Sequence, residues 1–316
     1  FTLIQSLSKP EKGYFKKFSE RQPGEKNYVA LFDAIENQKE YNEEKILKKF
    51  QGEKFTNNFS EAKSYLFELI LKSMNAFHAR SSYDITLREM LFGADFLFNK
   101  GMYNASEKLL KKTKEKAIAL NKHYLVFEAL LIQRRLDMGR AHNDITEQDL
   151  EQRLSEGILA LKKIKNEFEF SSLGETLSFY INKQGEVRTE QQQKKFKAII
   201  DHALMADEGK ALTIKSQRAY HFIQTYYNLY AQNNLPKAFA SAKKTVELIE
   251  LSQDTIWEEP SNYVNALNNL IILSFRNNKY DVFFDALEKT KKAISDPKIK
   301  LPTVIKDNVF LRCCTA

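Results

Sequence analysis

Glycine and proline are scarce in this sequence. The 316 residues include only 10 glycines and 6 prolines, and no proline lies between Pro23 and Pro236. A β-sheet protein of this length needs many turns rich in these two residues, whereas helices exclude both from their interiors. The scarcity argues against a sheet protein and predicts an all-α fold.

Cysteine and long apolar runs are also rare. The two cysteines, Cys313 and Cys314, are neighbours, and adjacent cysteines seldom form a disulfide because the resulting ring is strained. A chain without disulfides suits a reducing compartment, so we expect a cytoplasmic location. No apolar run approaches the roughly 20 residues that a membrane-spanning helix requires, and we therefore expect no membrane span.

The motifs of common enzymes and metal sites are missing. No two of the five histidines are four residues apart, and none has a cysteine or a pair of carboxylates at metal-ligand spacing. The glycine-rich phosphate loops and the G-x-S-x-G nucleophile motif are absent. We expect no metal, no cofactor and no catalytic residues, and we interpret the chain as non-enzymatic. An enzyme whose site is built from loops without a known motif is the less favoured alternative.

Apolar and aromatic residues, by contrast, are plentiful. Apolar residues make up 43% of the chain and aromatic residues 12%, with 23 Phe and 14 Tyr. This is enough material for a hydrophobic core, so extensive disorder is excluded. The net charge of +8 is spread along the chain without a basic tail or block, which indicates a mixed, solvated surface.

Residues 1–82 are predicted to form a small N-terminal helical module. Ser8 and Glu11 have the spacing of a capping box at the start of a helix, and Pro10 suits its first turn. A longer helix begins near residues 58–60 and ends near Arg80. Short helices that lead into a long one could form a helix-turn-helix that binds nucleic acid. This alternative is disfavoured, because the long helix carries few cations: Lys63, Lys72 and Arg80.

Residues 83–316 show a repeating pattern of paired helices. Turn residues lie near positions 103, 142, 187, 235 and 280, so successive turns are 39 to 48 residues apart. A nearly constant period of two helices predicts a solenoid of about five stacked helical hairpins. The paired helices are expected at 85–99 and 104–120, 122–138 and 146–168, 172–182 and 189–206, 212–232 and 237–252, and 261–276 and 281–295, with a terminal helix at 303–313.

The turn segment from Phe96 to Ala105 resembles the middle of a tetratricopeptide repeat. Gly101 at the turn and Tyr103 two residues later match the family pattern, and Ala105 lies about one position from the expected small residue. The pattern recurs at residues 231–238 and 276–283, where Asn233 and Asn278 replace the turn glycine. The chain also resembles uncharacterised bacterial proteins that join such repeats to a helical N-terminal module, which implies no particular activity.

The resemblance implies a right-handed superhelix of degenerate repeats that binds a protein or peptide partner along its concave face. In tetratricopeptide arrays the first helix of each pair lines that face. Counting back from each turn residue then gives the following groove candidates, together with Glu175: Arg88, Asp95, Asn99, Asn182, Tyr220, Tyr227, Tyr230, Asn265, Asn268 and Arg276. Asn can pair with a peptide backbone, Arg with carboxylates, and Tyr supplies stiff contact area.

An alternative interpretation is that the tyrosines of this set mainly pack between helices. Tyr226 occupies a position where a small residue usually permits close packing of the two helices of a repeat. We therefore expect that hairpin to splay, with a wider groove beside Tyr220, Tyr227 and Tyr230.

Overall fold

The computed structural model describes residues 1–20, 26–78, 82–185, 187–251, 253–296, 299 and 301. These residues form fifteen α-helices and short 3-10 segments, with no β-strand among them, so the all-α prediction is confirmed. The helices are α1 (Thr2–Ser6), α2 (Lys9–Glu20), α3 (Lys26–Glu36), α4 (Glu43–Lys49), α5 (Phe59–His78), α6 (Tyr83–Asn99), α7 (Tyr103–Ala119), α8 (His123–Gly139), α9 (Glu147–Gln184), α10 (Glu190–Ile200), α11 (Ile214–Tyr230), α12 (Leu235–Glu250), α13 (Gln253–Glu258), α14 (Pro260–Arg276) and α15 (Tyr280–Ser295). The terminal helix predicted at 303–313 lies outside the described residues.

The chain divides into two compact units, Phe1–Thr86 and Leu87–Ala316. In the first unit α2 packs against α3 and α5 around a core that includes Phe15, Phe32 and Ile70. The capping interaction predicted at the start of α2 is present, because Glu11 Oε2 accepts hydrogen bonds from the Ser8 amide at 2.7 Å and from its hydroxyl at 2.6 Å.

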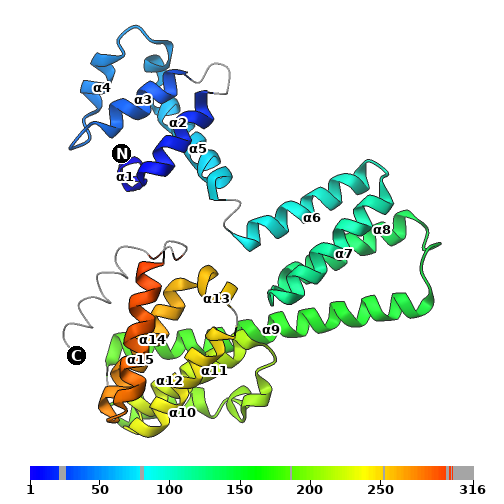
Figure 1. Ribbon diagram of the computed structural model, residues 1–316, viewed down its shortest axis with the longest axis vertical. Helices are drawn as coiled ribbons and strands as arrows, with labels where there is room; N and C mark the ends of the chain where they lie inside the picture. The colour runs from blue at the N-terminus through cyan, green and yellow to red at the C-terminus, as the bar shows by residue number, and fades with distance from the viewer. Residues whose placement is uncertain are drawn as a thin grey trace. The chain divides into compact units, whose positions relative to one another are not determined.

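The second unit is built from helices that pack against their neighbours in the chain (Figure 1). Contacts join α7 to α8, α8 to α9, α11 to α12, α12 to α14 and α14 to α15. At the first hairpin the buried Ser106 hydroxyl on α7 donates to the Ala94 carbonyl on α6 at 2.8 Å. Ser106, one residue after the expected Ala105, is therefore the small residue at this contact. The arrangement is compatible with a helical repeat.

The turns of three hairpins share one unusual backbone conformation. Gly101, Asn233 and Asn278 have φ angles of 72°, 48° and 54°, in the left-handed region. Glycine adopts this region without steric cost, and asparagine is among the few other residues that tolerate it. The asparagines at 233 and 278 therefore keep the backbone geometry that Gly101 has in the first hairpin.

The second and third predicted hairpins share a single continuous helix. The sequence predicts a break between residues 168 and 172, but α9 runs for 38 residues from Glu147 to Gln184, about 57 Å at 1.5 Å per residue. Ser172 lies within the helix, and its hydroxyl donates to the Phe168 carbonyl one turn earlier at 2.8 Å. The first half of α9 packs with α8 and the second half with α11 (Figure 1), so one helix serves both hairpins.

No helix in the described part of the chain is both long and apolar enough to cross a membrane.

Candidate functional site

A cavity of about 470 Å³ lies between the second half of α9, α11, α12 and α14. Its lining combines small, aromatic, carboxamide and charged side chains. The residues are Ser171, Gly174, Glu175, Ser178, Lys215, Arg218, Ala219, Phe222, Thr225, Tyr226, Ala242, Thr245, Ile249, Glu259, Asn262, Asn265, Ala266 and Asn269. The cavity thus draws on four helices, from α9 to α14.

A buried asparagine on α9 positions the start of α11. The Asn166 carboxamide donates to the Lys210 carbonyl at 2.9 Å and accepts from the Leu212 amide at 2.9 Å. Thr213 then caps α11 by accepting a hydrogen bond from the Ser216 amide at 3.1 Å. Because Asn166 is only 5% exposed, these bonds are shielded from water and hold the two cavity walls in register.

Small residues leave the space that forms the cavity. Ala219 on α11, Ala242 on α12 and Ala266 on α14 all line it. A side chain at Gly174 on α9 would approach Phe222 to 3.6 Å, so the glycine lies against this ring. Larger residues at the three alanines would fill the cavity. Its volume therefore depends on small side chains on α11, α12 and α14.

One end of the cavity holds a partly buried ion pair. Arg218 Nη2 on α11 contacts Glu259 Oε2, which precedes α14, at 2.8 Å, and the Asn262 carboxamide donates to the same oxygen at 3.1 Å. Burial alone would raise the pKa of Glu259, but the Arg218 charge and the Asn262 hydrogen bond outweigh burial and lower the pKa. Glu259 is therefore a carboxylate at neutral pH.

Carboxamides run along the α14 wall. Asn262, Asn265 and Asn269 follow each other at spacings of three and four residues, which places them on one face of the helix. The Tyr226 hydroxyl on α11 donates to Asn269 Oδ1 at 3.1 Å, so the two walls meet at this point. Each carboxamide offers both donors and an acceptor.

The charges of the lining nearly balance. Lys215 and Arg218 contribute two cations, while Glu175 and Glu259 contribute two anions. A balanced lining gives no strong preference for a highly charged ligand. Carboxamides and aromatic rings suit a ligand that carries its own amide donors and acceptors.

Of the groove candidates predicted from sequence, Asn265 and Glu175 line this cavity. The three tyrosines lie elsewhere on α11. Tyr220, Tyr227 and Tyr230 are half-buried and pack against the core that joins α9, α10 and α11. The structure thus places these tyrosines largely between helices, and a role for them in ligand binding stays a prediction.

Three other candidates lie apart from the cavity. Asn268 is buried within α14 at 5% exposure, whereas Arg276 is exposed at the end of that helix and Asn182 near the end of α9. Neither helix end is part of the cavity lining.

The candidates of the first hairpin form a polar row between α6 and α8. Asp95 contacts Arg135 at 2.6 Å and accepts from Asn99 at 3.3 Å, while Arg88 lies 3.7 Å from Glu128. Arg88, Asp95 and Asn99 are therefore close to one another along α6, but they are already paired with residues of the same unit.

Sequence reasoning missed most of the cavity lining. Counting from Asn233 selects positions 223 and 227, whereas the cavity is lined by Phe222 and Tyr226, one residue earlier on α11. One residue on a helix corresponds to a rotation of about 100°, enough to exchange a buried face for an exposed one. The carboxamides at positions 262, 265 and 269 were a usable signal, since their spacing is helical.

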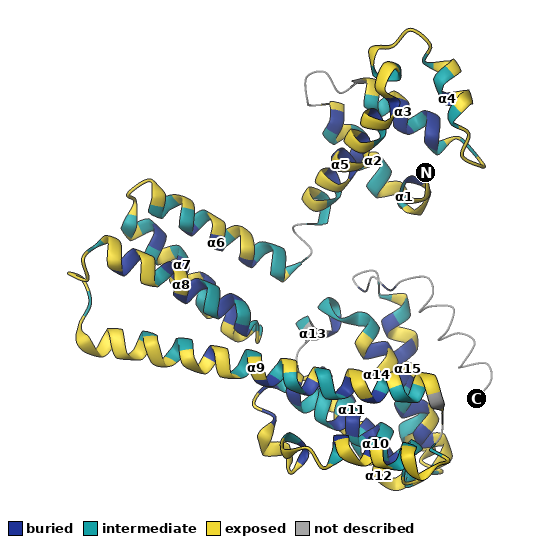
Figure 2. Cartoon of the chain, turned by 180° about the vertical axis from the view of Figure 1, so that it is seen from behind, coloured by how far each residue is buried: buried dark blue, intermediate teal, exposed yellow. Residues whose placement is uncertain are grey.

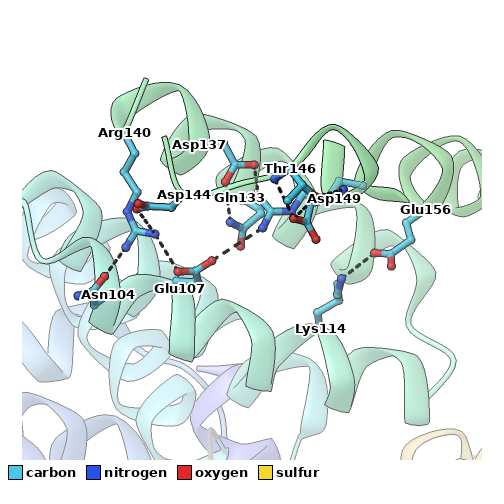
Figure 3. A network of polar contacts seen from close by, with 11 residues as sticks. Asn104, Glu107, Lys114, Gln133, Asp137, Arg140, Asp144, Thr146, Asp149 and Glu156 are labelled. Carbon is cyan, nitrogen blue, oxygen red and sulfur yellow. Dashed lines mark hydrogen bonds and ion pairs between the residues drawn. The ribbon is translucent and has the colours of Figure 1, made fainter. Parts of the chain in front are cut away.

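A separate polar network joins α7, α8 and α9 (Figure 3). Arg140 Nη1 contacts Glu107 at 2.8 Å, and Arg153 contacts both Asp137 and, at 3.8 Å, Glu107. These contacts tie the first half of α9 to the preceding hairpin.

Within the described residues, no cluster of three or more His, Cys, Asp or Glu side chains is arranged to hold a metal ion.

The helix considered for nucleic-acid binding presents little basic surface. Lys63 on α5 contacts Glu43 at 2.7 Å, and Lys72 is exposed. Arg80 lies outside the described residues. The nucleic-acid alternative stays a prediction.

Comparison of the chain with protein families, curated proteins and solved structures produced no match.

Proposed function

We propose that this chain is a non-enzymatic binding or scaffold protein that holds an extended segment of another polypeptide. Its second unit would be a right-handed superhelix of degenerate tetratricopeptide-like hairpins, with the ligand on the face formed by α9, α11 and α14. The observation that carries the proposal is the row of Asn262, Asn265 and Asn269 along the cavity.

Extended peptide backbone matches the chemistry of this row. Successive peptide units present an N–H and a C=O, and a carboxamide can pair with both at once. Tyr226 and Phe222 offer aromatic area for a side chain of the ligand, and the balanced charges admit sequences without a strong net charge.

The experiment is a screen of the full chain against a peptide array, followed by measurement of affinity for the peptides that bind. Asn265→Ala removes an exposed carboxamide of the lining, and Asn182→Ala removes an equally exposed one outside it. Loss of one or two hydrogen bonds should weaken binding about 5- to 30-fold for Asn265→Ala, with no change for Asn182→Ala.

Two outcomes would contradict the proposal. The first is an array with no bound peptide. The second is binding that Asn265→Ala and a combined Asn262→Ala and Asn265→Ala variant leave unchanged, with circular dichroism showing that both variants are folded.

A further inference from the structure

The stretch of α9 from Leu154 to Phe168 exposes a stripe of large apolar side chains. Leu154, Ile158, Leu161 and Phe168 are 54%, 69%, 48% and 73% exposed. Their spacings of four, three and seven residues place them on one side of the helix, in the pattern of a helix–helix seam. We refer to these four residues as the α9 stripe.

The opposite side of the first half of the helix is already occupied. Arg153 and Glu156 contact α8 and α7, and Ala160 is buried in the core formed with those helices. Most of the first half of α9 is coloured yellow, for exposed residues, in Figure 2. Contiguous exposed apolar surface of this kind usually marks an interaction site.

Charges beside the stripe change sign along the helix. Exposed Glu147 and Glu151 lie near its beginning, and exposed Lys162 and Lys165 lie near its end, where Lys165 also contacts Glu169 at 3.6 Å. A parallel helix of the same sequence would bring like charges together. An antiparallel one would bring the acidic end against the basic end, which is the arrangement that stabilises paired helices.

The same surface is therefore complementary to itself after a two-fold rotation. Glu151 and Lys165 each lie seven residues from Ile158, about 10.5 Å along the helix in opposite directions. With a two-fold axis near Ile158, Glu151 of each copy would lie close to Lys165 of the other, and Leu154, Ile158 and Leu161 of the two copies would meet between these pairs. Such self-complementarity defines an isologous dimer interface.

We propose that two copies of this chain associate through antiparallel pairing of the α9 stripe. The occupant of the stripe is a second copy of the chain, because the reversal of charge about Ile158 is what a two-fold contact requires. The proposal does not depend on the polypeptide-binding role of the cavity.

The first test measures the molar mass of the full chain by light scattering and by sedimentation, from about 1 to about 100 µM. We expect a reversible dimer. Ile158→Glu should weaken the dimer at least about 100-fold, because it places a charge at the centre of the apolar contact. The matched control is Leu159→Glu: Leu159 is 51% exposed but lies about 100° around the helix from Ile158, so the dimer should persist.

The second test determines the direction of pairing. In a background with Cys313→Ser and Cys314→Ser, the variants Glu151→Cys and Lys165→Cys should form an interchain disulfide when mixed, and little when each is alone. Parallel helices would instead form the disulfide within each single variant and little in the mixture. Glu151→Lys and Lys165→Glu should each weaken the dimer, whereas the variant that carries both exchanges should recover it.

Three results would overturn the proposal. They are a monomer up to about 100 µM, a dimer that Ile158→Glu leaves intact, and disulfides that form only between identical positions. Circular dichroism of each variant checks that the fold is retained.

Discussion

The hydroxyl of Tyr226 on α11 donates a hydrogen bond to Oδ1 of Asn269 on α14, at 3.1 Å. This contact joins the two helices that face each other across the cavity. Its position explains why a large residue is accommodated where tetratricopeptide-like repeats are expected to have a small one, because the ring extends along the cavity wall toward α14.

Tyr226→Phe should destabilise the protein modestly. The variant removes the hydroxyl and leaves the Asn269 oxygen without this donor, which should cost about 0.5–1.5 kcal/mol in the free energy of unfolding measured with urea. The matched control is Tyr280→Phe, because the Tyr280 hydroxyl bonds to nearby Asn278 at 3.1 Å on an exposed turn. Equal losses for the two variants would show that the contact between α11 and α14 contributes nothing specific.

Arg218→Met should raise the pKa of Glu259. Burial raises the pKa of this carboxyl and the Arg218 charge lowers it, so removal of the cation leaves burial opposed mainly by the Asn262 hydrogen bond. A titration followed by NMR of the labelled carboxyl carbon measures the change directly. An unchanged or lower pKa in the variant would contradict the described ion pair. The unfolding free energy should fall by roughly 2 kcal/mol at neutral pH.

His123 should make stability depend on pH. Burial, aided by the Lys163 charge, lowers the pKa of His123 from 6.5 to about 4. Between these values the unfolded chain binds a proton that the folded chain does not, so stability falls as the pH falls from 6.5 toward 4. His123→Gln removes this effect. Between pH 7.5 and pH 5, the free energy of unfolding of wild type should therefore fall by roughly 2 kcal/mol relative to that of His123→Gln.

Glu167 provides a comparison of opposite sign. Its Oε1 lies 3.8 Å from His123 Nε2, and burial raises its pKa above 4.5. A raised carboxyl pKa means that the folded chain binds the proton more tightly, so this group favours folding as the pH falls toward 4.5. The free energy of unfolding of wild type should therefore rise relative to that of Glu167→Gln as the pH is lowered. Urea unfolding at each pH measures both values. A constant difference for both variants would contradict the two pKa shifts.

Arg153→Met should be strongly destabilising. Asp137 is 5% exposed and is held by Arg153 and by Gln133 at 3.0 Å, so loss of the arginine leaves a buried carboxylate poorly compensated. We expect a loss of about 3 kcal/mol in the unfolding free energy.

The control for this variant is a second ion pair of α9, which joins it to α7 instead of α8. Lys114 contacts Glu156 at 2.6 Å, but both side chains are partly exposed, so Lys114→Met should cost only about 0.2–1 kcal/mol. A variant with Asp137→Leu and Arg153→Met together should be more stable than Arg153→Met alone, because no charge is then buried. If the double variant were the less stable of the two, the unpaired Asp137 carboxylate would not be the cause of the loss.

Local signals made several parts of the fold predictable. Scarce glycine and proline indicated helices, and the turns at Gly101, Asn233 and Asn278 were placed correctly because a left-handed turn residue is restricted by its own backbone. The capping pair of Ser8 and Glu11 is equally local, since its partners are three residues apart.

Other features depended on contacts between distant segments. The sequence around Ser172 permits either a helix or a break, and the helix continues because Phe170 and Leu177 are both buried against the helices that follow. Likewise, whether Tyr226 or Tyr227 faces the cavity is decided by how α11 rotates against α9 and α14, which no pattern within α11 specifies.

Local sequence specifies the helical class and the turns at Gly101, Asn233 and Asn278, because each depends on residues only a few positions apart. Tertiary structure decided the continuity of α9, the cavity among Ala219, Ala242 and Ala266, and the side of α9 that stays exposed. These features arise where helices from distant parts of the chain pack together, and packing selects one rotation and one register from several that local sequence allows.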